Sequence, residues 1–139
     1  MKLQLLLFDI FIIYDIIIIE KEKGMIKIGM DCYIFEAPNH RVFKDENWYS
    51  SGIVKERMYW RKNWDMVNNW SFIPKDYESG EFIEIGSKEL EEMIKVACAH
   101  RDYFGTYDTV PQLCELRDEV LGWEQNEIKN RKLFVEYDW

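Results

Sequence analysis

A segment rich in tryptophan, tyrosine and arginine stands out between residues 56 and 70, where the chain reads ERMYWRKNWDMVNNW. Tryptophan, tyrosine and arginine carry much of the binding energy at protein interfaces. The segment therefore predicts a binding surface. Its candidate binding residues are Tyr59, Trp60, Arg61, Asn63 and Trp64. In the alternative interpretation the aromatic side chains belong to the core, and Arg61 extends from it into solvent.

A titratable triplet, His100-Arg101-Asp102, follows a second apolar segment. Positive charge at the C-terminus of a helix is stabilised by the helix dipole, so a structural role explains His100 and Arg101. The alternative is a polar pocket that unites these two residues with Tyr59, Arg61 and Asn63. Such a pocket predicts a small-ligand or nucleotide-binding protein, or an enzyme.

Motifs that carry known chemistry are absent from the sequence. We find no phosphate-binding glycine loop, zinc-protease motif, nucleophile elbow or calcium loop. The chain has two histidines, which excludes a histidine-rich metal site. Its three cysteines, Cys32, Cys98 and Cys114, are widely spaced and fit free thiols in a reducing cytoplasm. The sequence therefore predicts no catalytic residue, no metal and no cofactor, and it favours a protein that is not an enzyme.

The charge of the chain is strongly acidic. Among its 139 residues, 26 are acidic and 18 are lysine or arginine, giving a formal net charge of −8. An acidic surface repels phosphate backbones, which disfavours direct binding of nucleic acid. The same charge suits a protein that occupies a basic surface on another protein. In the simpler alternative, the charge serves only solubility.

Residues 1–24 differ in composition from the rest of the chain. Leucine, isoleucine and phenylalanine form an almost continuous run, interrupted by Asp9 and Asp15. The run suits a hydrophobic membrane anchor. However, Lys21-Glu22 can be encoded by a ribosome-binding sequence placed just before a start codon at Met25. We therefore expect residues 1–24 to be a mis-annotated leader, with membrane attachment only if they are native, and residues 25–139 to form a single domain.

The remaining chain predicts alternating strands and helices. Strands are expected at residues 26–35, 82–85 and 133–137, from their β-branched and aromatic content. Helices are expected at residues 58–70, 87–98 and 109–125, from their apolar spacing. Ser87 is the predicted N-cap of the second helix. The buried face of that helix is predicted to contain Leu90, Met93, Ile94, Ala97 and Cys98. The order βαβααβ predicts an α+β fold: a small mixed or antiparallel sheet with about three helices packed on one face.

Two short segments resemble a family of small uncharacterised proteins from bacteriophages and prophages. Residues 29–34, GMDCYI, resemble the family opening GLDMYL, and residues 59–62 resemble its helix-opening element YWRK. The resemblance covers residues 28–70 and extends loosely to the C-terminus. Many relatives carry a histidine inside the helix, where this chain has residues 65–69, DMVNN, so histidine chemistry does not transfer. The resemblance implies a phage or prophage origin.

The leading functional hypothesis is a phage or prophage accessory protein in the cytoplasm of the host bacterial cell. It would bind, and in one version inhibit, a host or defence protein through its acidic surface. The alternative is a small-ligand or nucleotide-binding protein, or an enzyme, with a pocket near Tyr59, Arg61 and His100.

Overall fold

The computed structural model describes residues 30–61, 69–99 and 109–139. The predicted leader at residues 1–24 lies outside these ranges. So do Asn63, Trp64, His100 and Arg101, four of the candidate binding residues.

A four-stranded antiparallel sheet with the strand order β2-β1-β4-β3 is the centre of the fold. The strands are β1 (Asp31–Ala37), β2 (Lys55–Arg61), β3 (Phe82–Ile85) and β4 (Lys132–Asp138). The register of β1 with β4 runs without interruption from the pair Asp31↔Asp138 to the pair Ala37↔Lys132. The two central strands therefore join the beginning and the end of the described chain.

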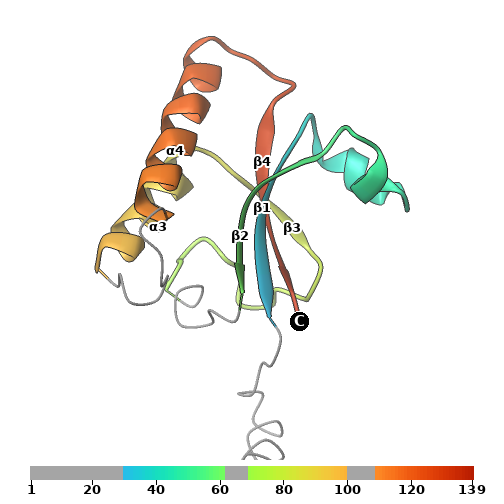
Figure 1. Ribbon diagram of the computed structural model, residues 1–139, viewed down its shortest axis with the longest axis horizontal. Coiled ribbons are helices and arrows are strands. Elements are labelled where there is room, and N and C mark those ends of the chain that lie inside the picture. The colour runs from blue at the N-terminus through green and yellow to red at the C-terminus, as the bar shows by residue number, and fades with distance from the viewer. Residues whose placement is uncertain (1–29, 62–68, 100–108) are drawn as a thin grey trace, which may run out of the picture.

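Helical elements lie on both sides of this sheet (Figure 1). The helices α3 (Ser87–Ala99) and α4 (Thr109–Gln125) cover one side. Two short 3₁₀ helices, η2 (His40–Lys44) and η3 (Trp48–Ser50), lie on the other side. They belong to the connection between β1 and β2.

Each central strand is buried on both faces because successive side chains of a strand point in opposite directions. Cys32 and Ile34 face α3 and α4 in the larger core. Phe35 faces the other side, where Phe43 and Phe134 complete a smaller aromatic core. Burial on both faces explains why the five consecutive residues 133–137 of β4, LFVEY, are all buried.

The structure confirms the α+β class and the antiparallel sheet, with a different set of helices. The described ranges contain two α-helices and two 3₁₀ helices, where about three helices were predicted. The strand at 82–85 is confirmed, as are the strand at 133–137, within a longer β4, and the helix at 109–125. Of the predicted strand at 26–35, the described part belongs to β1.

The predicted helix at residues 58–70 is wrong at its beginning. Residues 58–61 belong to β2, where Trp60 pairs with Cys32 and Tyr59 pairs with Tyr33. Burial alternates along this strand, since Met58 and Trp60 are buried while Tyr59 and Arg61 are exposed. Aromatic side chains favour strands when they pack against neighbours on a sheet. Residues 69 and 70, the end of the predicted helix, are not helical, and residues 62–68 lie outside the described ranges.

Helix α3 begins one residue earlier than its predicted cap implies. The carbonyl oxygen of Gly86 accepts the Leu90 N–H at 3.1 Å, which places Gly86 at the N-cap. Glu89 Oε1 accepts the Gly86 N–H at 2.7 Å, as in one half of a capping box. The hydroxyl of Ser87 instead donates to Glu124 Oε1 at 2.7 Å, so the assignment of Ser87 as N-cap was wrong.

The predicted buried face of α3 is confirmed for four of its five residues. Leu90, Met93, Ile94 and Ala97 are buried, whereas Cys98 is exposed. At 100° per residue, Cys98 lies about 80° around the helix from Leu90, at the margin of the apolar stripe.

A network of ion pairs joins β1, β2 and α4 at one end of the sheet. Arg57 Nη1 donates to Glu36 Oε1 at 2.6 Å, and Arg57 Nη2 donates to Glu119 Oε2 at 2.9 Å. Arg131 Nε donates to Glu36 Oε2 at 2.8 Å, with its guanidinium carbon 4.4 Å from the centre of the Trp123 ring. Burial opposes ionisation of Glu36, but the hydrogen bonds from the two arginines lower its pKa below the usual value.

We expect Trp60→Ala to lower the free energy of unfolding by about 3–5 kcal/mol, because the mutation leaves a cavity in the larger core. Tyr59→Ala is the matched control and should cost about 1 kcal/mol, mainly through a lost exposed hydrogen bond. Trp60 is 7% exposed and Tyr59 is 43% exposed. Urea unfolding monitored by circular dichroism measures both values. Equal losses would contradict the placement of residues 58–61 in a strand.

Arg57→Met should lower the free energy of unfolding by about 1.5–3 kcal/mol at pH 7, because Glu36 then keeps only one charged donor. The control Arg117→Met removes exposed pairs with Glu91 and Asp118 and should cost less than about 1 kcal/mol. Glu36 has a lowered pKa in the folded state, so its contribution is present at neutral pH and is lost as the pH falls through that folded value. The difference between wild type and Arg57→Met should therefore shrink in acid. A pH-independent difference in urea unfolding would contradict this.

Candidate functional site

The sheet face opposite α3 and α4 has two different halves. Over one half, the ring of Phe43 stacks on Phe82 at 3.9 Å between centroids, and Trp48 packs against Phe35 at 5.1 Å. The other half, toward the C-terminal end of β4, has exposed side chains at Tyr59, Arg61 and Asp138 beside the buried Glu136. We call this second area the open half. It consists of Asp31, Tyr33, Tyr59, Arg61, Glu136 and Asp138.

The strand register places these six side chains in two adjacent rows. One row runs from β2 to β3 through Tyr59, Tyr33, Glu136 and Phe82. The next row, two residues along, contains Arg61, Asp31 and Asp138. Residues directly opposite on neighbouring strands have Cβ atoms about 4.5–5.5 Å apart, so the side chains within each row are in contact range.

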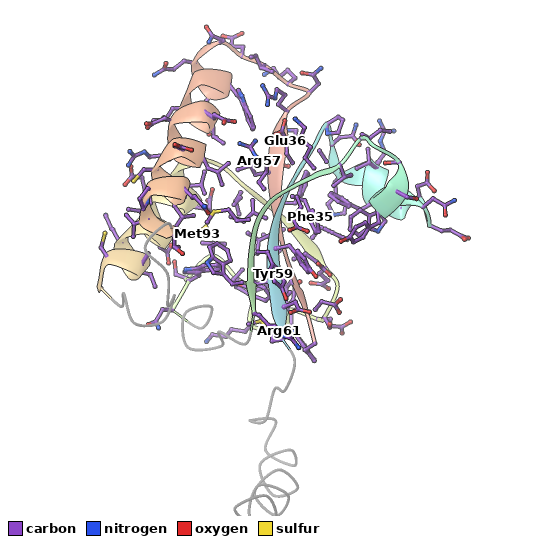
Figure 2. All side chains as sticks on the ribbon, viewed as in Figure 1. Phe35, Glu36, Arg57, Tyr59, Arg61 and Met93 are labelled. Carbon is purple, nitrogen blue, oxygen red and sulfur yellow. The ribbon has the colours of Figure 1, made fainter. Side chains whose placement is uncertain are left out.

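Aromatic rings form the β2 side of the open half. The ring centroids of Tyr33 and Tyr59 lie 5.0 Å apart, and Tyr33 also stacks on Phe35 at 5.1 Å. The hydroxyl of Tyr59 donates to Asp31 Oδ1 at 2.7 Å, which holds that ring over the sheet. Figure 2 shows Tyr59 and Arg61 on β2 toward the end of the sheet away from Glu36 and Arg57.

Negative charge dominates the electrostatics of this area. Burial, followed by the charge of Asp31, raises the pKa of Tyr33 to about 12. The hydrogen bond to Asp31 is the main cause that raises the pKa of Tyr59, and Arg61 opposes it only in part. Both shifts show that adding another negative charge here is unfavourable. The open half is therefore suited to a cationic group and unsuited to a phosphate or a carboxylate.

Glu136 is the most unusual residue of the open half. It is 7% exposed. Its side chain leaves the sheet on the same face as Phe134, because Val135 and Tyr137 on either side belong to the larger core. Within the described ranges, the side chain of Glu136 takes part in no hydrogen bond or ion pair. Burial, and then the charges of Asp138 and Asp31, raise the pKa of this carboxyl to about 7.

This arrangement can bind a cation. A desolvated carboxylate beside aromatic rings attracts ammonium and guanidinium groups. In the part of the chain that the structure describes, no three histidine, cysteine, aspartate or glutamate side chains are placed to hold a metal ion.

The structure brings together only two of the seven candidate binding residues. Tyr59 and Arg61 lie two positions apart on the open half. Trp60 points to the opposite face and packs edge-on against Trp70, with ring centroids 5.9 Å apart. Its assignment to a binding surface was therefore wrong. The other four, Asn63, Trp64, His100 and Arg101, lie outside the described ranges.

Sequence reasoning missed Tyr33, Glu136 and Asp138. The signal was present in the last strand, LFVEYD, where a glutamate interrupts an apolar run. A charged residue inside a strand that is buried on both faces needs a partner or a function. Nothing in the sequence, however, shows that Asp31 lies beside Asp138, because 107 positions separate them and strand pairing alone unites them.

A small cavity of about 110 Å³ lies elsewhere, between the C-terminal part of α4 and the strands β3 and β4. Gly86, Trp123 and Arg131 are among its lining residues, and Tyr59 and Arg61 are not. Ligand pockets usually enclose about 300–1,000 Å³. This cavity therefore lies apart from the predicted ligand pocket, whose residues His100 and Arg101 are outside the described ranges.

Comparison of the chain with protein-family models, with curated proteins and with solved structures found no match in any of the three. In the ranges that the structure describes, neither α-helix has the length and apolar character needed to cross a membrane.

Glu136→Gln should stabilise the protein by about 2–3 kcal/mol at pH 8 and change little at pH 4.5. The folded-state pKa of about 7 lies above the ordinary glutamate value of 4.5, so wild-type stability falls as the pH rises between them. Glutamine carries no charge and removes this slope. Urea unfolding across this pH range measures it.

Glu84→Gln is the matched control for this prediction. Glu84 lies on the neighbouring strand and already pairs with Lys132 at 3.2 Å in an exposed position. Its substitution should shift the free energy of unfolding by less than about 1 kcal/mol at either pH. A wild-type stability that rises from pH 5 to pH 8 in step with Glu136 ionisation would contradict the unpaired carboxylate.

Proposed function

We propose that this protein binds a basic surface of another protein through the open half of its sheet. The observation that supports this proposal is the combination of two tyrosine rings with three carboxylates in the open half. Tyr59 is 43% exposed there, and Arg61 and Asp138 are exposed beside it. Tyrosine and arginine are enriched at interface hot spots, and complementary charge speeds association and selects the partner.

We further propose that the partner is a host or defence protein, and that this chain is a phage or prophage accessory protein of the host bacterial cytoplasm. The net charge of −8 and the resemblance of residues 28–70 to a phage protein family support this assignment. A partner that normally binds nucleic acid has the basic surface that an acidic protein would occupy and block.

The ligand-pocket alternative has weaker support. A nucleotide bound near Tyr59 and Arg61 would bring phosphate charges next to Asp31 and Asp138, which is unfavourable between like charges. We therefore retain protein binding as the proposed function.

We expect a photocrosslinking amino acid at position 59 of the full chain to capture a host protein in a bacterial lysate. The same amino acid at position 121 is the matched control, because Leu121 is exposed on α4, on the opposite side of the sheet. Mass spectrometry identifies the captured protein. The proposal expects a protein captured at position 59 only, and identical capture at both positions contradicts it.

With the purified partner, Tyr59→Ala and Arg61→Ala should each weaken binding about tenfold or more, whereas Leu121→Ala should have no effect. The affinity should also fall with added salt, because exposed charges are screened. If the partner binds nucleic acid, this protein should displace it. Equal affinity of wild type and Tyr59→Ala would overturn the assignment of the binding surface.

A further inference from the structure

The carboxylate of Glu136 lacks the donors that a buried charge ordinarily has. Glu36, the other glutamate buried in this sheet, is held by two arginines at 2.6 and 2.8 Å. Glu136 is 7% exposed, yet no described residue donates to it or pairs with it. A buried ionised carboxylate without donors is unfavourable by several kcal/mol in general. The free protein therefore keeps a carboxyl that no described donor satisfies and that a cation from another molecule can pair with in its ionised form.

The surroundings of Glu136 specify the kind of partner. Tyr33 and Phe82 stand directly opposite it on the two neighbouring strands. Asp31 and Asp138 follow at the rim in the adjacent row. Aromatic rings on both sides, with the carboxylates of Asp31 and Asp138 in the adjacent row, favour binding of a flat organic cation over a hydrated metal ion. The guanidinium of arginine is planar, weakly hydrated and able to bond both oxygens of one carboxylate.

The protein's own arginine on this face does not occupy that position. Arg61 lies on β2 opposite Asp31, and β1 separates it from β4. Two strand spacings correspond to about 10 Å. Arg61 therefore adds a positive charge at the edge of the open half and leaves the Glu136 carboxylate free to pair with another cation.

We propose that the open half contains an anchor site for one arginine side chain of the partner protein, whose guanidinium pairs with the Glu136 carboxylate between Tyr33 and Phe82. This inference rests on the proposed protein-binding function and adds the chemistry of its central contact. Asp31 and Asp138 steer the cation to the site, and the rings exclude water from the pair.

The pairing must depend on pH, because only the ionised carboxylate attracts a cation. The pKa of Glu136 is raised to about 7 in the free protein, by burial and then by Asp138 and Asp31. Arginine affinity should therefore increase as the pH rises from 6 to 8. The other titratable or charged groups on this face and on the two 3₁₀ helices over it are Asp31, Tyr33, His40, Arg41, Lys44, Tyr49, Glu56, Tyr59, Arg61, Glu84, Lys132 and Asp138.

The test titrates the full chain at pH 8 with N-acetyl-arginine amide and follows backbone amide signals by NMR. The neutral citrulline analogue has the same shape without the charge. We expect saturable shifts in β1 and β4 around residues 33 and 136 with the arginine probe, and at least about tenfold weaker binding of the citrulline probe. Glu136→Gln should weaken arginine binding to the same degree.

Glu84→Gln is the control, because it makes the same chemical change on the same sheet but at a carboxylate already paired with Lys132. It should leave the arginine affinity within about twofold of wild type. The amide spectrum of each variant shows whether it is folded, and Glu136→Asp provides a second variant that keeps the charge but shortens its reach. Equal arginine affinity of wild type and Glu136→Gln, or equal binding of both probes, would overturn the anchor site. Capture of a partner through position 59 without arginine binding would overturn the anchor site alone and leave the proposed function standing.

Discussion

The pairing of β1 with β4 is the interaction on which the rest of the structure depends. Seven consecutive residues of each strand are in register, with the larger core on one face and the smaller aromatic core over part of the other. This pairing brings residues about a hundred positions apart in the chain into contact, at the entropic cost that closing a long loop entails. The cores on both faces, the ion pairs at one end and the acidic rows at the other all follow from this one register. A slip by one residue would exchange the two faces and bury the acidic row against α3 and α4.

The two buried glutamates show how one sheet treats the same side chain in opposite ways. Glu36 lies near a β-bulge in β2. At this bulge Arg57 has no partner residue on β1, and its side chain pairs with Glu119 of α4. Arg131 completes the pair from the turn before β4, so the pKa of Glu36 is lowered despite burial. Glu136 lies at the regular end of the sheet, where no bulge redirects a cation toward it and its pKa is raised. The ion pairs of Glu36 stabilise the fold. For Glu136 we propose a contact with another molecule.

The sequence was sufficient to predict an element where its apolar residues follow one clear periodicity. Helix α4, the strand β3 and the strand β4 were predicted because their burial follows a single periodicity or a continuous apolar run. The segment around Trp60 was misassigned because tyrosine and tryptophan at positions 59, 60 and 64 fit helical spacing as well as alternation. Only the contact with β1 decides between them, and that contact is not local. The same limit explains the site, since Tyr59 and Arg61 were found by composition whereas Tyr33, Glu136 and Asp138 join them only through pairing.

The strand at residues 55–61 also changes what the Trp/Arg-rich segment means. On a helix, Tyr59 and Trp60 would lie about 100° apart and contribute to one broad surface. On a strand they point to opposite faces, so Trp60 completes the core with Trp70 while Tyr59 extends the open half. One aromatic dipeptide thus links the stability of the sheet to the surface that we propose for binding. The acidic groups then set the selectivity of that surface, because Asp31, Glu136 and Asp138 repel phosphate and favour a basic protein chain.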